Sequence, residues 1–463
     1  MKGTGHHTTR SAAATVVTTT AAALALALVA TGCGGGAADR DENTVRIAYQ
    51  KFGTFIAMDS LMQKVKEEFE ADNPGVTVEL QAIEAPAEDY QTQVNLMNGS
   101  ASEAPDLIYQ DSFTINQDAD AGYLMPLDEY FDAWEDADRF SVQEAQAVTS
   151  LDGQRYGVML GTDVRGLWYN SELLDQAGVE TPWEPATWDE VLDAARAVQD
   201  EFGDEVTALN VYSGTPAGEA ASLQGFQMLL SGTEDALFDD DSQKWITGSQ
   251  GFTDSLEFVR TVYDEGLALD VQDALDANVG TVNNEERFPS GEMAISLDGS
   301  WATQSWIPEA NRPWDGWEDV MVFTRMPTQN GQGAGATSMS GGWALSMGGQ
   351  ATNPELAWEV MTYALSKENA VKFAIEGGQI PVRSDVAEDP AFLDNAPMAE
   401  EFAALVDITG FRPAYSEYPR ISIAVQEAME AVMLGEATPE EAADLYSQEV
   451  EGIVGPDNVT GGS

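Results

Sequence analysis

Residues 45–80 read VRIAYQKFGTFIAMDSLMQKVKEEFEADNPGVTVEL, and this stretch decides the fold class. Apolar residues alternate with polar or small ones over 45–49, which is the spacing of a strand. They then recur at helical spacing over 55–69, and Asn73-Pro74-Gly75 ends that helix. Alternation returns over 76–80. The stretch therefore predicts strand, helix and strand, the β-α-β unit of a parallel sheet covered by helices.

The same alternation continues along the chain. A helix around residues 90–97 leads to the apolar run Leu107-Ile108-Tyr109, which predicts a third strand. Ligands of such sheets bind beyond the carboxyl ends of the strands, here at residues 50–53 and 110–114. Further helices are predicted over residues 187–198, 256–263, 354–373, 421–434 and 439–453. We expect an α/β protein, and the roughly 420 residues that follow the N-terminal segment exceed one comfortable domain and suggest two.

The N-terminus predicts a lipoprotein signal peptide. Lys2 and Arg10 precede an apolar stretch over 21–30, which is too short for the roughly 20 residues of a membrane span. The tetrad Ala30-Thr31-Gly32-Cys33 resembles the lipobox of bacterial lipoproteins, whose cysteine receives a diacylglycerol anchor and palmitate. We expect the mature chain to begin at Cys33, anchored by lipid on the outer face of the cytoplasmic membrane. The alternative is a simple signal peptide that carries a leftover thiol.

The scarcity of histidine and cysteine excludes several chemistries. The only histidines, His6 and His7, lie in the segment expected to be removed, and Cys33 is the only cysteine. The mature chain would therefore lack the triads of histidine-dependent nucleophilic catalysis and the usual zinc ligands. It would also lack a disulfide. We expect no metal site and no cofactor, and only carboxylate chemistry or an all-oxygen metal site stays compatible with the composition.

The charge balance bears on possible partners. Asp and Glu number 79 against 21 Lys and Arg, a formal net charge of −58. Such a field repels nucleic acid and anionic lipid, so we expect no nucleic-acid binding and no membrane contact beyond the lipid. Hydrophobic residues make up 43% of the chain, which is enough for a large core. The acidity fits adaptation to high salt, where charges are screened, and equally an acidic extracellular protein.

Six motifs, in chain order, resemble the extracellular solute-binding proteins of bacterial ABC importers, specifically the carbohydrate-binding, maltose-binding-like group. They are Ala104–Ile108, Asp120–Leu127, Tyr156–Asn170, Thr187–Glu190, a two-part motif at Phe288–Ala294 with Asp298–Trp301, and Gly341–Trp343. Thr187 and Glu190 also have the spacing of a helix capping box. Each motif is weak alone, but together and behind a lipobox they are specific.

The resemblance implies a two-lobe periplasmic-binding-protein-like fold of type II. Each lobe would be a mostly parallel sheet flanked by helices, with the ligand cleft between the lobes and crossings near residue 160, Val320–Met326 and Leu365. It also implies a monomer that binds a mono- or oligosaccharide, passes it to ABC transporter permease subunits and catalyses nothing. The expected divisions are a signal peptide over 1–32, a flexible tether over 33–43 and a tail over 456–463. Lobe 1 would comprise 44–160 and, together with a hinge, 320–365. Lobe 2 would comprise 161–319 and 366–455.

Candidate ligand-binding residues follow from what a sugar presents. Apolar C–H faces need flat aromatic rings, and hydroxyl groups need carboxylates or amides. The resemblance points to Trp301 first, and the candidates are Trp301, Trp343, Asp163, Asp111, Lys51, Phe52 and Tyr418. The alternative for Trp301 is a position in the core, and the alternative for Asp163 is an ion pair with Arg165. Trp168, Trp188 and Trp358 fit core positions better.

Two other functions stay open at this point. The same fold could bind a polyamine or another cation, since acidic residues such as Asp111 and Asp163 would suit it and tryptophan also binds cations. A secreted glycoside hydrolase with two carboxylates is the rival from another class, although no acidic pair stands out. Residues 116–120 resemble the start of a calcium-binding loop, but Ala121 occupies the position where such a loop needs glycine.

Overall fold

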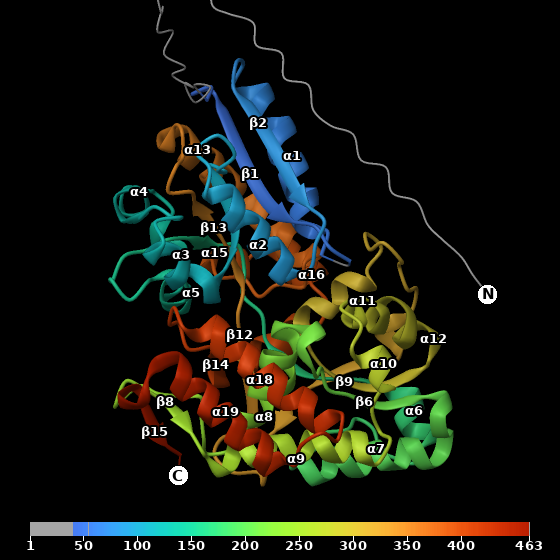
Figure 1. The fold of residues 1–463 in the computed structure, drawn as a ribbon. Coiled ribbons are helices and arrows are strands. Elements are labelled where there is room, and N and C mark those ends of the chain that lie inside the picture. The colour runs from blue at the N-terminus through green and yellow to red at the C-terminus, as the bar shows by residue number, and fades with distance from the viewer. Residues whose placement is uncertain (1–39, 54, 463) are drawn as a thin grey trace, which may run out of the picture. The chain divides into compact units, whose positions relative to one another are not determined.

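A five-stranded sheet organises the N-terminal part of the chain (Figure 1). The computed structural model describes residues 40–53 and 55–462. In order across the sheet, the strands are β2 (Thr77–Ile83), β1 (Thr44–Gln50), β3 (Leu107–Asp111), β13 (Trp343–Met347) and β4 (Val158–Met159). β1 runs parallel to β2 and β3, whereas β13 runs antiparallel to β3 and β4. The β-α-β unit predicted from residues 45–80 is confirmed.

Helices cover both faces of this sheet because successive side chains of β1 point in opposite directions. Its helices are α1 (Ala57–Asp72), α2 (Ala87–Asn98), α3 (Ile115–Asp120), α4 (Asp128–Asp132), α5 (Val142–Val148), α13 (Pro354–Ala364), α14 (Lys367–Glu376), α15 (Ser384–Ala387) and α16 (Pro390–Asn395). Val45, Ile47 and Tyr49 pack with α1, α13 and α14, and Ala48 packs with α2 on the other side. We call this sheet and its helices lobe 1.

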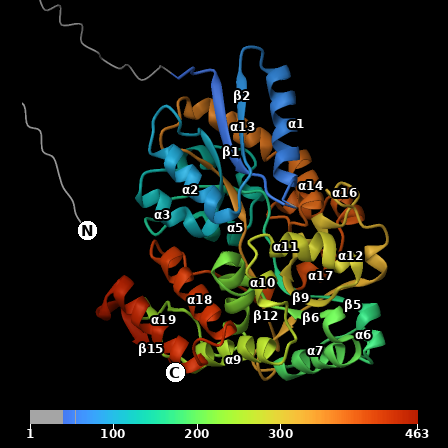
Figure 2. The same ribbon diagram turned by 45° about the vertical axis from the view of Figure 1, so that its right-hand side comes forward.

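A second sheet of four strands forms the framework of lobe 2. In order, its strands are β10 (Met321–Thr324), β5 (Arg165–Asn170), β9 (Met293–Gly299) and β6 (Thr207–Asn210). The helices of lobe 2 are α6 (Ser171–Gln176), α7 (Trp188–Phe202), α8 (Met228–Leu230), α9 (Gln250–Asp264), α10 (Val271–Ala274), α11 (Val279–Val282), α12 (Phe288–Ser290), α17 (Ala399–Ala403), α18 (Tyr418–Met433) and α19 (Pro439–Val454). Figure 2 shows α18 and α19 beside α9, as their contacts require.

Backbone segments that connect the lobes are joined to one another. The N–H groups of Thr162 and Ile380 donate to each other's carbonyl oxygens, at 2.9 and 2.8 Å, and the Thr162 hydroxyl donates to the carbonyl of Gly341. A third sheet joins β11 (Met326–Pro327), β12 (Ala336–Ser340) and β14 (Thr409–Phe411). We call residues 160–164, 336–342 and 409–412 the hinge region.

The structure corrects several expected lobe boundaries. β10 pairs with β5, so residues 321–324 belong to the sheet of lobe 2 and not to lobe 1. α14 packs on α1, and α16 packs on α14, so the chain returns to lobe 2 after α16 and not near Leu365. The physical reason is that residues 354–373 do not form one helix: α13 ends at Ala364, and Ser366 turns the chain into α14.

Both predicted ends of the folded body also differ from expectation. Residues 459–461 form β15 (Val459–Gly461), which pairs in a fourth sheet with β8 (Lys244–Thr247) beside β7 (Phe238–Asp239), so they are not a tail. Arg40, expected in the tether, donates to the Asp106 carboxylate at 2.8 Å. Both segments make hydrogen bonds with the folded body, which a solvated tether or tail would not make.

The capping box predicted at Thr187 and Glu190 is half formed. The Thr187 hydroxyl accepts from the N–H of Glu190, as predicted, but the Glu190 carboxylate accepts from Ala186 and not from Thr187. The complete capping box lies at Thr438 and Glu441. Within residues 40–462, no helix is long and apolar enough to cross a membrane.

Candidate binding site

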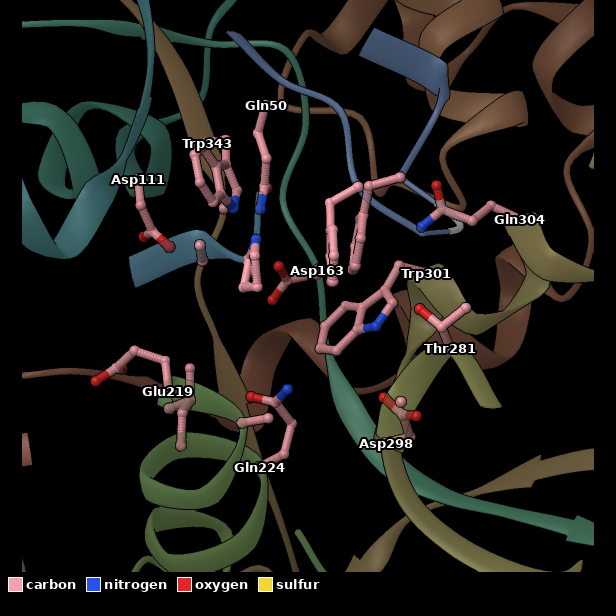
Figure 3. A pocket seen from close by; sticks show the side chains of 18 of the residues that line it. Gln50, Asp111, Asp163, Glu219, Gln224, Thr281, Asp298, Trp301, Gln304 and Trp343 are labelled. Carbon is pink, nitrogen blue, oxygen red and sulfur yellow. The ribbon is translucent and has the colours of Figure 1, made fainter. Parts of the chain in front are cut away.

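A cavity of about 240 Å³ lies between lobe 1 and lobe 2 (Figure 3). From lobe 1 it is lined by Gln50, Phe52, Tyr109, Asp111 and Trp343. From lobe 2 it is lined by Tyr212, Glu219, Gln224, Asn284, Asp298 and Trp301. β1 and β3 reach the cavity with their carboxyl ends, which is where a parallel sheet presents its ligand-binding groups.

Trp301 projects into the middle of this cavity from the 3₁₀ helix Ser300–Ser305, which directly follows β9 (Figure 3). The indole lies against Gly299, where a Cβ would overlap its six-membered ring, so only glycine leaves room for it. The guanidinium of Arg165 lies over the ring, 4.6 Å from its centroid. With 9% of its surface exposed, Trp301 is held in place yet open to a solute.

Trp343 begins β13 on the opposite wall and provides a second aromatic surface. Its ring stacks on Tyr109 from β3, with centroids 4.9 Å apart and planes 25° apart. Gly342 precedes it with a φ of 131°, a conformation that favours glycine. In the register of the two antiparallel strands Trp343 lies opposite Asp111, and Tyr109 is its diagonal neighbour on the same face, so the two rings form a preset apolar wall.

Charged groups of the cavity are paired. Arg165 donates to the Asp163 carboxylate at 2.6 Å and to the carbonyl of Met339 at 3.0 Å. Arg412 donates to Asp111 at 2.8 Å and to Glu219 at 3.1 Å. Burial raises the pKa of the Asp111 carboxyl, and the charge of Arg412 opposes that rise. The walls thus offer carboxylates whose orientation is already fixed by guanidinium partners.

A third polar group lies beside Trp301 in lobe 2. The Asp298 carboxylate accepts hydrogen bonds from the Tyr212 hydroxyl at 2.7 Å, from Asn284 Nδ2 at 3.3 Å and from the N–H of Gly299 at 2.8 Å. Burial raises the pKa of Asp298, and its hydrogen bonds oppose this. Asn284 Oδ1 is buried and has no hydrogen-bond partner among the described residues, so it is an acceptor available to a solute hydroxyl.

Five of the predicted ligand-binding residues line the cavity: Trp301, Trp343, Asp163, Asp111 and Phe52. The ion pair considered for Asp163 exists as well, so the two interpretations of that residue are compatible. Whether these side chains touch a solute stays a prediction. Cys33 lies outside the described residues.

Lys51 and Tyr418 do not line the cavity, which corrects their placement. The Lys51 ammonium donates to Asp59 on α1, because consecutive residues after a strand point to opposite sides and Phe52 takes the inward one. Tyr418 is fully buried in the first turn of α18, where its hydroxyl bonds with Gln227 and Glu219. It supports the wall of the cavity from behind.

Several lining residues were not predicted. Asp298 belongs to the motif that points to Trp301, so a signal for it was present. Glu219 and Arg412 carry no recognisable motif and lie almost 200 residues apart, so only the fold brings them together. Nothing in their local sequence would have found them.

Asp118 lies in a buried polar cluster behind the wall, outside the cavity. Its Oδ2 accepts from the side-chain amides of Gln110 at 2.7 Å and Gln91 at 2.8 Å, and its Oδ1 has no partner among the described residues. Burial raises the pKa of this carboxyl to about 6, and its hydrogen bonds offset only part of the rise. No cationic side chain lowers this pKa, so the folded protein keeps the neutral acid up to a higher pH than the unfolded chain does.

We expect Asp118 to make the protein less stable as the pH rises from about 4 to about 6. The folded state holds a proton that the unfolded state has released over that range, so stability falls, by on the order of 3 kcal/mol for a shift to about 6. Asp118→Asn, which never ionises, should remove this loss. Urea unfolding of both proteins at pH 4 and 7 measures it, with exposed Asp204→Asn as control; equal pH dependence in wild type and Asp118→Asn would contradict the prediction.

Comparisons with known proteins bear on the family and the fold. Residues 64–404 match the sequence model of bacterial extracellular solute-binding proteins. A lactose-binding protein of Rhizobium radiobacter is 23% identical over 322 residues, which cover 68% of this chain and 67% of that protein.

Solved structures share the fold over most of their length. A solute-binding protein of an ABC transporter from Thermotoga lettingae, bound with α-D-tagatose, is 26% identical with a TM-score of 0.76, covering 89% of this chain and 99% of that one. The GacH receptor of Streptomyces glaucescens, solved without ligand and with acarbose, is 24% identical with a TM-score of 0.74, covering 89% and 98%. The expected α/β two-lobe fold of type II is thereby confirmed.

Proposed function

Since this chain belongs to the family of bacterial extracellular solute-binding proteins, we propose that it captures a sugar outside the cell and delivers it to an ABC importer. One observation carries the proposal: the cavity between the lobes sets flat aromatic rings beside oriented carboxylates and amides. This is the combination that a sugar needs, because its rings have apolar faces and its edges carry hydroxyl groups.

The mode of binding follows from the two walls. A sugar ring would pack against Trp301 in lobe 2, with Trp343 and Tyr109 in lobe 1. Its hydroxyls would donate to Asp111, Asp163 and Asn284 Oδ1. A solute held in this way contacts both lobes at once, so binding favours a closed arrangement, which the importer's permease would recognise.

Binding screens test the proposal directly. D-Tagatose, lactose, maltose and acarbose are added to the protein, with spermidine as the cationic comparator and thermal unfolding as the readout. A solute that binds only the folded state adds about 2.7 kcal/mol at 100 times its Kd, so at least one sugar should raise the Tm. A rise with spermidine alone would contradict the sugar assignment, and release of dye from a chromogenic glycoside would contradict a role without catalysis.

We also propose that Cys33 carries the lipid anchor and that the protein acts as a monomer. The support is the lipobox-like tetrad at residues 30–33, together with the family's extracellular location. A glycine-rich run over 34–36 would then separate the lipid from the folded body.

Cys33→Ser should release the protein from the membrane into the soluble fraction. The thiol is the only acceptor for the thioether-linked lipid, whereas the sugar cavity lies in residues that the substitution does not touch. Membrane fractionation measures the release, and Ser100→Ala, an exchange far along the chain, serves as control. Equal retention of Cys33→Ser and wild type would show that the anchor lies elsewhere.

A further inference from the structure

Three charged side chains form a continuous bridge from lobe 1 to lobe 2. Arg412 Nη2 lies 2.8 Å from Asp111 Oδ1, and Arg412 Nη1 lies 3.1 Å from Glu219 Oε2. We call these three residues the interlobe bridge. Their side chains are 5%, 12% and 14% exposed for Arg412, Asp111 and Glu219, so the bridge is nearly dry.

Each member of the bridge belongs to a different part of the fold. Asp111 ends β3 in lobe 1 and also accepts from the N–H of Phe113. Glu219 precedes the π-helix Ala220–Gln227 in lobe 2 and is held there by the hydroxyls of Tyr418 and Ser222. Arg412 directly follows β14 in the hinge region. One guanidinium thus links both lobes to the hinge.

Arg165 provides a contrast within the same cavity. Its carboxylate partner, Asp163, lies two residues away in the hinge region. Its other partners are the carbonyl of Met339 in the hinge region and the side chain of Gln224 in lobe 2. None of these contacts reaches lobe 1. Gly341 lies between the two arginines, and a Cβ there would come within 3.0 Å of Arg412 Nη2 and 3.6 Å of Arg165 Nη2. Only Arg412 holds acids from opposite lobes.

The electrostatic consequence of removing Arg412 follows from this placement. Two carboxylates on opposite lobes would face each other without the cation between them, in surroundings where charges are poorly screened. Like charges in such a site repel strongly, and each has lost the partner that compensated its burial. Moving the lobes apart relieves both effects, because it separates the acids and admits water.

We propose that Arg412 is the positioning residue that sets the separation of the two lobes and holds the solute-free cavity close to its closed arrangement. This inference extends the proposed function and rests on it, because closure has a role only if the protein captures a solute. In a solute-free protein the bridge already favours the closed arrangement, which lowers the reorganisation that binding must bring about.

The spacing of the lobes can be measured without any solute, so the test is separate from the identity of the sugar. Leu96 on α2 of lobe 1 is 73% exposed, and Leu445 on α19 of lobe 2 is 58% exposed. Both are replaced by cysteine for spin labels in the full-length chain, with Cys33→Ser to remove the only native thiol. Electron–electron double resonance then gives the distribution of distances between the labels.

Arg412→Gln should shift this distribution to longer distances in the absence of solute. Arg165→Gln, which removes the same charge from the same cavity, should leave it unchanged. Asp111→Asn combined with Glu219→Gln in the Arg412→Gln background should restore the short distance, because the repelling charges are gone. Arg412→Lys should restore it in part, since one ammonium cannot contact both acids as a guanidinium fork does.

Two results would overturn the proposal. One is an unchanged distance distribution in a folded Arg412→Gln protein, and the other is an equal shift in Arg165→Gln. Circular dichroism and thermal unfolding check that the variants fold, and Arg412→Lys, which should still lengthen the distances in part, replaces Arg412→Gln if the latter does not. If no sugar binds in the screen but the distances shift as expected, the proposed function is wrong and the role of Arg412 in setting the lobe separation is still supported.

Discussion

Trp301→Ala is expected to weaken sugar binding by about tenfold to several hundredfold. An aromatic contact contributes about 0.5–1.5 kcal/mol beyond the area that it buries, and the lost area adds about 25 cal/mol per Å². The indole also packs on Gly299 and lies under the guanidinium of Arg165. Its removal therefore loosens the cavity wall in addition to deleting the contact with the sugar. Calorimetric titration with the strongest binder of the sugar screen measures the loss.

The control for Trp301 is Trp358→Ala. Trp358 is a half-buried tryptophan on α13 that packs against Trp134 and Tyr130, on the part of lobe 1 that does not line the cavity. It should lose stability without losing affinity. If Trp301 were a core residue, its truncation would cost several kcal/mol of folding stability. Unchanged affinity in a stable Trp301→Ala protein would remove the residue from the site.

Arg155→Met should destabilise the fold by about 3–5 kcal/mol, the usual cost of leaving one partner of a buried ion pair alone. Arg155 makes a two-pronged contact with Glu144, at 2.8 and 2.9 Å, and the Glu144 side chain is 0% exposed. Glu144 also accepts from the N–H of Met159, next to the first connection between the lobes. Urea unfolding at neutral pH measures the loss.

The matched control is the double variant Arg155→Met with Glu144→Gln, which should recover much of the stability because no buried charge is left unpaired. The loss in Arg155→Met should also shrink as the pH falls. Burial already raises the pKa of Glu144 and Arg155 opposes this, so without the arginine the carboxyl takes up a proton more readily. A loss that is equal at all pH values, or equal in single and double variants, would argue against an electrostatic origin.

Local patterns along the chain predicted much of the fold. Alternation over 45–49 and 76–80 is visible because the large apolar side chains of these strands share one face, whereas small or polar side chains lie on the other, and the helix between them shows its apolar face directly. The one long helix predicted over 354–373 is two helices, because apolar spacing continues through the turn at Ser366 and hides the break. Short strands such as β10 and β15 were missed, since their pairing depends on distant partners.

Local order along the chain predicted the α/β class and the positions of Asp111 and Phe52 at strand ends beside the cavity. The resemblance to solute-binding proteins pointed to Trp301, Trp343 and Asp163, which line the cavity as well. That Lys51 and Tyr418 turn away, and that Arg412 lies between Asp111 and Glu219, follows from how the two lobes pack. The partners of Arg412 are 301 and 193 residues away, and no local pattern encodes which distant charges meet when two lobes pack.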